Sequence, residues 1–245
     1  MELNPYGFQS MWLQGDLVTR AVAVLLLVMS VASWYVMLTK AIQVWLLRRP
    51  AWAAGHQFWD TTSLDQGVAT LGRANPFVDL AQAGVNAMRH HAAHKGHLHD
   101  QLSVSDWVTL SLRQAIDETA ARLQSGMAVL ASVGSTAPFV GLFGTVWGIY
   151  HALVSIGTSG QASIDKVAGP VGEALIMTAL GLAVAIPATF GYNALVRGNK
   201  STLAKLNKFG FDLHALFVTG ARSELAGHDG KSASDGARLI AVGGA

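Results

Sequence analysis

The chain contains no cysteine and little charge. Without cysteine it cannot form a disulfide framework, a zinc finger or a thiol nucleophile. Only 13% of its 245 residues are charged, against about 25% in an ordinary soluble domain, which is too few to cover the surface of one soluble domain. The net charge of +2 does not indicate nucleic-acid binding. With 51% hydrophobic residues and a mean hydropathy of +0.36, the composition predicts a membrane protein.

Three segments are long and apolar enough to cross a bilayer of about 30 Å as helices. Residues 21–39 carry no charge, and Arg20 is the only basic residue before them. A cleaved signal peptide would have a basic n-region and a shorter apolar run, so this pattern favours a retained span. A further 42 residues between Arg122 and Asp165 carry no charge, which is about 63 Å of helix. We expect transmembrane helices at 17–40, 129–156 and 167–196, with Pro170 opening or kinking the third.

The basic residues predict the orientation. One basic residue, Arg20, lies before the uncharged run 21–39 and one lies between the second and third spans, whereas eight lie from Lys40 to Arg122 and seven after the third span. Basic loops stay in the cytoplasm. We therefore expect segments 1–16 and 157–166 outside the cytoplasm, and a helical loop 41–128 and a helical extension 197–220 inside it. The Gly/Ser/Ala-rich tail 221–245 is expected to be disordered.

Two apolar stripes at helical spacing predict long cytoplasmic helices that pack on each other. The first is expected to begin at a cap, Ser103 or Ser105, and to run without a break into the second span. Asn75-Pro76 indicates a break in the loop, and shorter helices are expected in its remainder. The first stripe comprises Val108, Leu112, Ile116, Ala120, Leu123, Met127 and Leu130, and the second Leu203, Leu206, Phe209 or Gly210, Leu213 and Phe217.

The histidine-rich segment 90–99 raises the question of a metal site. His90 and His94 would lie on one face of a helix. Gly96 and the absence of acidic or thiol ligands at compatible spacing favour a surface loop instead. We predict no metal and no cofactor, and leave open a low-affinity metal or pH response.

Glu173 is the only charged residue within the expected third span. A carboxylate inside a membrane costs about 3 kcal/mol, and such residues usually face a bundle interior or a water path. Burial favours the neutral acid, so Glu173 is a candidate proton relay. Two alternatives remain: Glu173 lies about 9 Å inside the helix start and could reach the outer interface, or it could pair with a cation on a partner helix as part of a scaffold.

Thr145 and Thr178 are the other polar candidates. Each is expected about 17 Å below the outer face, near mid-membrane, on helices of opposite direction. Their hydroxyls can donate and accept along a proton path, although threonine is also common in helix packing. Glu173 and Thr178 are about 140° apart around a helix, so they need not line one surface.

Small residues form stripes on the second and third spans. Such stripes allow close approach of helices and suggest an oligomer. No phosphate loop, catalytic triad or carboxylate pair is found, so we expect no enzyme. A solute transporter would need an internal repeat, which is absent. The expected packing or pore-lining residues are Gly134, Pro138, Gly141, Gly148, Ala174, Gly181 and Ala185.

Two sequence blocks resemble the motifs of the MotA/TolQ/ExbB proton-channel family. Residues 137–149 (APFVGLFGTVWGI) are similar to its second-span motif. Residues 172–175 (GEAL), 178–182 (TALGL) and 185–188 (AIPA), followed by Tyr192-Asn193, are similar to its third-span motif. The match runs in order from about residue 131 to 193. The family implies an all-α membrane protein whose second and third spans extend into the cytoplasm as long helices, assembled as a homo-oligomeric ring.

Within the family the chain resembles the ExbB branch. That resemblance implies a bacterial inner-membrane protein with a periplasmic N-terminus and a cytoplasmic C-terminus. It implies a pentamer around the helices of an ExbD-like single-span partner, which energises a TonB-like protein for outer-membrane uptake of iron-siderophores and cobalamin. Glu173 matches the acid of the proton path, and Thr145 and Thr178 match the polar residues that flank it.

A TolQ-type subunit of the Tol-Pal envelope system is the alternative, since its motifs are nearly the same. Phe139 and residues 4–16 favour the ExbB branch. A flagellar MotA-type stator has four spans, whereas three are expected here.

Overall fold

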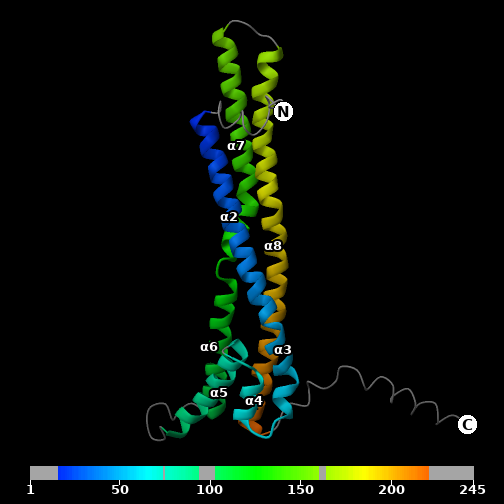
Figure 1. The fold of residues 1–245 in the computed structure, drawn as a ribbon. Coiled ribbons are helices and arrows are strands. Elements are labelled where there is room, and N and C mark those ends of the chain that lie inside the picture. Colours follow the sequence, from blue (N-terminus) through cyan, green and yellow to red (C-terminus); the bar gives the residue numbers. More distant parts are fainter. Residues whose placement is uncertain (1–15, 74, 94–102, 160–163, 221–245) are drawn as a thin grey trace, which may run out of the picture. The chain divides into compact units, whose positions relative to one another are not determined.

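A computed structural model describes residues 16–73, 75–93, 103–159 and 164–220, and within them all regular structure is helical. The predicted all-α class is therefore confirmed for the described part of the chain. It divides into two compact units, one of residues 1–47 and 120–202 and one of residues 48–119 and 203–245. The elements are α2 (Leu17–Leu46), α3 (Arg48–Gly55), η1 (Gln57–Asp60), α4 (Leu64–Thr70), α5 (Pro76–Ala93), α6 (Val104–Gln124), α7 (Met127–Ser159) and α8 (Ile164–Thr219) (Figure 1).

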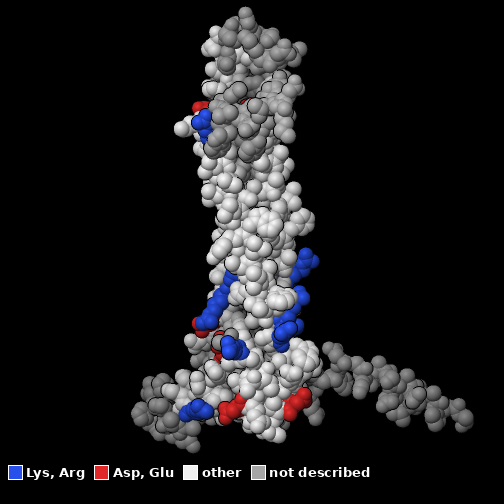
Figure 2. Space-filling model, viewed as in Figure 1, with Lys and Arg blue, Asp and Glu red and all other residues white. Residues whose placement is uncertain are grey.

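The first unit contains α2, α7 and α8 up to Thr202. Three helices of the described chain are long and apolar enough to cross a membrane, as predicted. Large apolar side chains on them stand out from the unit, among them Leu27, Phe139 and Phe190, and the face of these helices seen in Figure 2 has a long stretch without charged residues. An apolar surface of this extent requires lipid or other protein chains around it. The chain is thus a multi-pass membrane protein.

Side-chain caps mark the starts of α2 and α6, whereas a proline expected at the start of α8 lies inside that helix. Asp16 caps α2, because its Oδ1 accepts from the backbone N–H of Leu17 at 2.6 Å. The predicted cap of α6 is Ser103, whose hydroxyl accepts from the backbone N–H of Asp106 at 3.1 Å. Pro170 lies inside α8 rather than at its first turn, so the expectation that it opens the helix is wrong. The helix starts earlier, at Ile164.

The expected uninterrupted helix into the second span is broken at Ser125 and Gly126. Gly126 has a φ of +79°, a left-handed conformation that ends α6 before α7 begins. The break removes the helical partners of the last α6 carbonyls. Lys40 donates to the carbonyl of Arg122 at 2.8 Å, and the side-chain amide of Asn199 donates to that of Leu123 at 3.0 Å. Side chains from α2 and α8 therefore satisfy the end of α6.

The second unit is built around an aromatic cluster. Phe209 of α8 meets Phe58 and Phe77 edge-on, with ring centroids 5.0 and 5.9 Å apart. Val108 and Leu112 of α6 are buried in the same core as Leu206, Phe209 and Leu213 of α8. The predicted packing of the two stripes on each other is therefore confirmed within this unit. The edge-on geometry is favourable because it places a ring's positive edge on its neighbour's negative face.

The loop between the first two spans folds into the short helices that were expected. Asn75 marks the predicted break: its Oδ1 accepts from the backbone N–H groups of Phe77 and Val78 at 3.0 and 3.3 Å, and so caps α5. Pro76 then occupies the first helical position, where its missing N–H costs nothing. The expectations for segment 1–15, for the histidines from 94 to 99 and for the tail 221–245 lie outside the described residues.

Gly126→Ala should lower the free energy of unfolding by about 1–2 kcal/mol, because an alanine pays a steric cost at positive φ. Space is not the cause, since the added Cβ would lie 3.4 Å from Val36, an ordinary contact. Thermal unfolding of the purified protein in detergent measures the effect. Gly157→Ala is the control: it lies inside α7 with nothing within 4 Å of the new Cβ, so it should be neutral or stabilising. Equal effects of the two variants on the free energy of unfolding would contradict the left-handed conformation of Gly126.

Candidate functional site

The helices α7 and α8 approach each other most closely at two glycines. A Cβ on Gly141 would lie 2.6 Å from the carbonyl oxygen of Met177, and a Cβ on Gly181 would lie 2.6 Å from that of Ala137. Neither distance is possible for a real side chain. The two backbones therefore touch because both positions lack a side chain, as in small-residue contacts between membrane helices.

The same contact continues along both helices. A Cβ on Gly148 would lie 2.9 Å from that of Ala174, and a Cβ on Gly134 would lie 2.5 Å from the Thr189 hydroxyl. Rising residue numbers on α7 meet falling numbers on α8, so the helices are antiparallel. Of the other predicted packing residues, Ala185 is buried, and Pro138 lies half-buried inside α7. Because proline has no N–H, the carbonyl of Gly134 loses its usual helical donor.

Thr145 and Thr178 meet within this contact. The Thr145 hydroxyl lies within hydrogen-bond distance of the Thr178 hydroxyl. It also lies 3.1 Å from the carbonyl oxygen of Gly141 on its own helix and 3.2 Å from that of Ala174 on the facing helix. Thr145 is only 7% exposed. The structure thus brings together two of the three predicted polar residues, from opposite helices, in a buried position.

These four oxygens offer more acceptors than the two hydroxyl protons can use at once. Each hydroxyl has one proton to donate and can also accept. The Thr145 proton can point to either carbonyl or to Thr178, and the Thr178 proton can point to Thr145. The pair can therefore hold its hydrogen bonds in more than one direction, which is what a proton-conducting chain requires.

Glu173 lies on α8 directly before Ala174, and its side chain is half-buried. It precedes Thr178 by five residues, which is about 7.5 Å along the helix and about 140° around it. Its backbone neighbour Ala174 carries the carbonyl that Thr145 contacts. Glu173 therefore sits beside the threonine pair along the helix and points to a different side of α8.

One polar contact near the site was missed by the sequence analysis. The indole N–H of Trp147 on α7 donates to Oδ2 of Asp16 at 3.2 Å, while Oδ1 of the same carboxylate caps α2. Asp16 thus joins the start of α2 to α7, two residues beyond Thr145. The two residues are far apart in the sequence, and no sequence pattern predicts their contact. Among the described residues, no group of three His, Cys, Asp or Glu could hold a metal ion.

Gly141→Ala should destabilise the packed pair of helices by about 1–3 kcal/mol, the usual range for overpacking. The new methyl would meet the backbone of α8, which cannot turn aside as a flexible side chain can. Thermal unfolding in detergent measures the change. Gly172→Ala on α8, where nothing lies within 4 Å of the new Cβ, is the control. A Gly141→Ala protein as stable as the control would contradict the close approach.

A family model and the related proteins below point to the same family. The family model described as the MotA/TolQ/ExbB proton channel family matches residues 75–208. Biopolymer transport protein ExbB of Xanthomonas campestris pv. campestris is 45% identical over 91% of this chain and 87% of its own length. Its namesake in Neisseria meningitidis is 42% identical over 83% of this chain and 94% of its own length.

A more distant relative comes from another branch of the same family. Tol-Pal system protein TolQ of Pseudomonas aeruginosa is 31% identical over 88% of this chain and 96% of its own length. The matched family region contains Thr145, Glu173 and Thr178 as well as the two glycines where α7 and α8 touch. The family match covers more than half of the chain, and the relatives align with nearly all of it: this chain belongs to the MotA/TolQ/ExbB proton channel family.

Proposed function

We propose that this chain is the ExbB-type subunit of a proton-driven complex in the bacterial inner membrane. In that complex it assembles as a ring, which the resemblance puts at five copies, around the helices of an ExbD-like single-span partner. Proton flow through the complex energises a TonB-like protein, which opens outer-membrane transporters for iron-siderophores and cobalamin. The relatives called ExbB, at 42–45% identity, favour this branch over TolQ at 31%.

The observation that carries the proposal is the buried hydrogen bond between Thr145 and Thr178. The bond joins α7 to α8. Over residues 167–196 of α8 the only charged residue is Glu173. In this proposal Glu173 takes up and releases a proton, and the two hydroxyls carry the hydrogen-bonded path past the point of closest helix contact. The partner supplies the acid at the centre of the ring.

The exposed apolar faces of α2, α7 and α8 fit an assembly in the membrane. Phe139, Phe190 and Leu175 stand out from the unit, and further copies, the partner helices and lipid would cover them. The positive-inside rule places the N-terminus in the periplasm, and the second unit with the C-terminus in the cytoplasm. One proton that crosses 100 mV releases about 2.3 kcal/mol from the voltage alone, so work against protein-binding interfaces would need several protons.

Glu173→Gln should abolish energised uptake while the protein still assembles with its partner, because glutamine keeps the size of the side chain and cannot exchange a proton. The measurement is uptake of labelled ferric siderophore in cells without their own ExbB, together with co-purification of the partner. Asp117→Asn, at an exposed position of α6, is the control and should retain uptake. Loss of the partner with Glu173→Gln would instead indicate a scaffold, and normal uptake would remove Glu173 from the path.

Complementation of two deletion strains separates the ExbB and TolQ branches of the family. The wild-type chain, expressed with its genomic single-span neighbour, should restore siderophore uptake to cells without ExbB. It should leave the detergent sensitivity of cells without TolQ unchanged. The reverse result would assign the chain to the Tol-Pal system and overturn the ExbB-type proposal.

Thr145→Val should reduce uptake strongly and stability only slightly. Valine has the same shape without the hydroxyl, and a hydrogen bond between membrane helices contributes about 0.6 kcal/mol on average. Uptake and thermal unfolding are measured on the same preparation. Thr136→Val on the same helix is the matched control, because Thr136 is exposed and its hydroxyl bonds only its own helix, at the carbonyl of Ser132. A loss of uptake no larger than the control's would argue for a packing role alone.

A further inference from the structure

The outer face of helix α3 combines two cations with a large aromatic ring. Three alanines on the other side of the helix are buried in the apolar core of the second unit and fix which side of α3 faces outward. At 100° per residue, Arg48, Trp52 and Arg49 lie within about 100° of one another around the helix, and all three are exposed. Trp52 is 57% exposed, although tryptophan is largely buried in most soluble units. The buried alanines are Ala51, Ala53 and Ala54.

The two guanidinium groups on this face are unpaired. In the part of the chain that the structure describes, neither Arg48 nor Arg49 has a hydrogen bond or an ion pair from its side chain. The sequence around them offers no partner either, since residues 17–59 contain no Asp or Glu. A guanidinium presents several N–H donors in one plane, an arrangement that fits two oxygens of a phosphate group. The face therefore presents two adjacent donors for a phosphate-containing ligand.

Trp52 is held in its exposed position by the residue one turn later. Its indole stacks on the ring of His56, with ring centroids 5.4 Å apart and an interplanar angle of 19°. Nδ1 of His56 donates to the backbone carbonyl of Trp52 at 3.2 Å, which fixes the histidine ring under the indole. The indole N–H has no partner among the described residues. A tryptophan with one apolar side and a free N–H is the residue most typical of the interface between hydrocarbon and water.

The position of α3 in the chain places it at the depth of lipid headgroups. Helix α2 has 30 residues, a length of about 45 Å, which equals the thickness of a bilayer with both headgroup layers. Lys40 is the only charged residue within residues 21–47. After α2, a single residue, Leu47, precedes α3. The two arginines therefore follow the membrane-spanning helix at the point where it leaves the bilayer.

We propose that the outer face of α3 binds the headgroups of anionic phospholipids in the leaflet where α2 ends. The guanidinium groups of Arg48 and Arg49 bind phosphate oxygens, and the Trp52 indole lies between the headgroups and the acyl chains. Two observations select lipid as the occupant: the face is positively charged and without an acid nearby, and it directly continues a helix that lipid already surrounds. That this leaflet is the cytoplasmic one rests on the orientation proposed above, whereas the binding itself does not.

The absence of native cysteine permits a single reporter on this face. Gly55→Cys places the reporter at the last residue of α3, which is exposed and has nothing within 4 Å of an added Cβ. The full-length protein is labelled there with an environment-sensitive fluorophore and reconstituted in nanodiscs of phosphatidylcholine with increasing shares of phosphatidylglycerol. We expect the emission to shift to shorter wavelength as the anionic share rises. Molar salt should reverse much of the shift, because it screens charges at the membrane surface.

Two double variants with the same loss of charge test the role of the arginines. Arg48→Gln with Arg49→Gln should require several times more phosphatidylglycerol for the same shift. Arg89→Gln with Arg113→Gln, at exposed positions of α5 and α6 in the same unit, is the matched control and should behave as the protein with the reporter alone. All four side chains are exposed, and equal thermal unfolding of the two variants confirms that folding is preserved.

Three outcomes would overturn the proposal. No response to phosphatidylglycerol would exclude binding of anionic headgroups. Equal effects of the two double variants would mean that lipid responds to net charge and not to α3. An apolar environment in phosphatidylcholine alone, unchanged by the arginine substitutions, would assign the face to a second copy of the chain.

The orientation is tested separately with the same reporter position. A thiol reagent that cannot cross membranes should react with the cysteine introduced at position 55 in inverted membrane vesicles and leave it unmodified in intact spheroplasts. The reverse result would overturn the proposed orientation of the chain, and with it the cytoplasmic side of the lipid site. It would leave the fluorescence result on lipid binding unaffected, so the two failures are distinguishable.

Discussion

The contact between the backbones of α7 and α8 is the constraint on which the membrane unit depends. Lipid tails are as apolar as leucine, so burial alone does not hold membrane helices together, and close packing must supply the attraction. At Gly141 and Gly181 the packing reaches its limit, since a methyl group on either would collide with the other helix. That closeness lets the Thr145 hydroxyl reach the carbonyl of Ala174 across the interface. The close packing of the helices and the buried contact between the two threonines are therefore one feature of the structure.

Polar groups at both ends of α2 are also paired across helices. Helix ends leave backbone groups without partners in their own helix. At the turn that separates α6 from α7, Lys40 and Asn199 bind the carbonyls that the break leaves open. At the opposite end of α2, Asp16 caps the helix and accepts from Trp147. Lys40 and Asn199 join α2 and α8 to the end of α6, and Asp16 joins α2 to α7, which carries Thr145. A shift of one helix would therefore disturb its polar partners on another.

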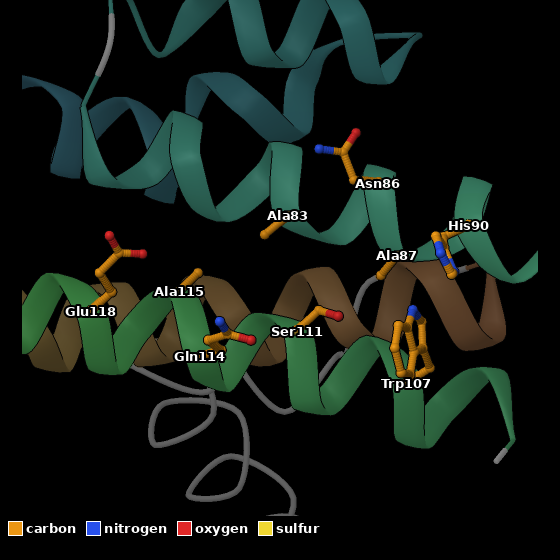
Figure 3. Close-up of a pocket in the computed structure, with 9 residues that line it drawn as sticks. All are labelled: Ala83, Asn86, Ala87, His90, Trp107, Ser111, Gln114, Ala115 and Glu118. Atoms are coloured by element: carbon orange, nitrogen blue, oxygen red, sulfur yellow. The ribbon is translucent and has the colours of Figure 1, made fainter. Parts of the chain in front are cut away.

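The second unit is stabilised mainly by the burial of an apolar core rather than by close backbone packing. It has a compact apolar core with Phe209 at its centre, and burial of that core from water is the main stabilising force. Short helices with side-chain caps surround it, because the loop contains turn residues such as Ser63 and Asn75 that accept from the next helix. Alanines on facing sides of α5 and α6 leave a groove of about 350 Å³ between these two helices (Figure 3).

The sequence by itself determined the three spans, the all-α class and the apolar stripes of α6 and α8, because uncharged length and helical periodicity are local properties of the chain. Ser125-Gly126 is a turn signal that the sequence analysis passed over. Charge and polarity within apolar spans marked Glu173, Thr145 and Thr178, the motif resemblance agreed with them, and spacing predicted the depth of the two threonines. Only the tertiary structure decided that the two hydroxyls meet and that Lys40 and Asn199 close the end of α6. Those contacts join residues up to 82 positions apart, and one sequence has no periodicity that reports which helix faces which.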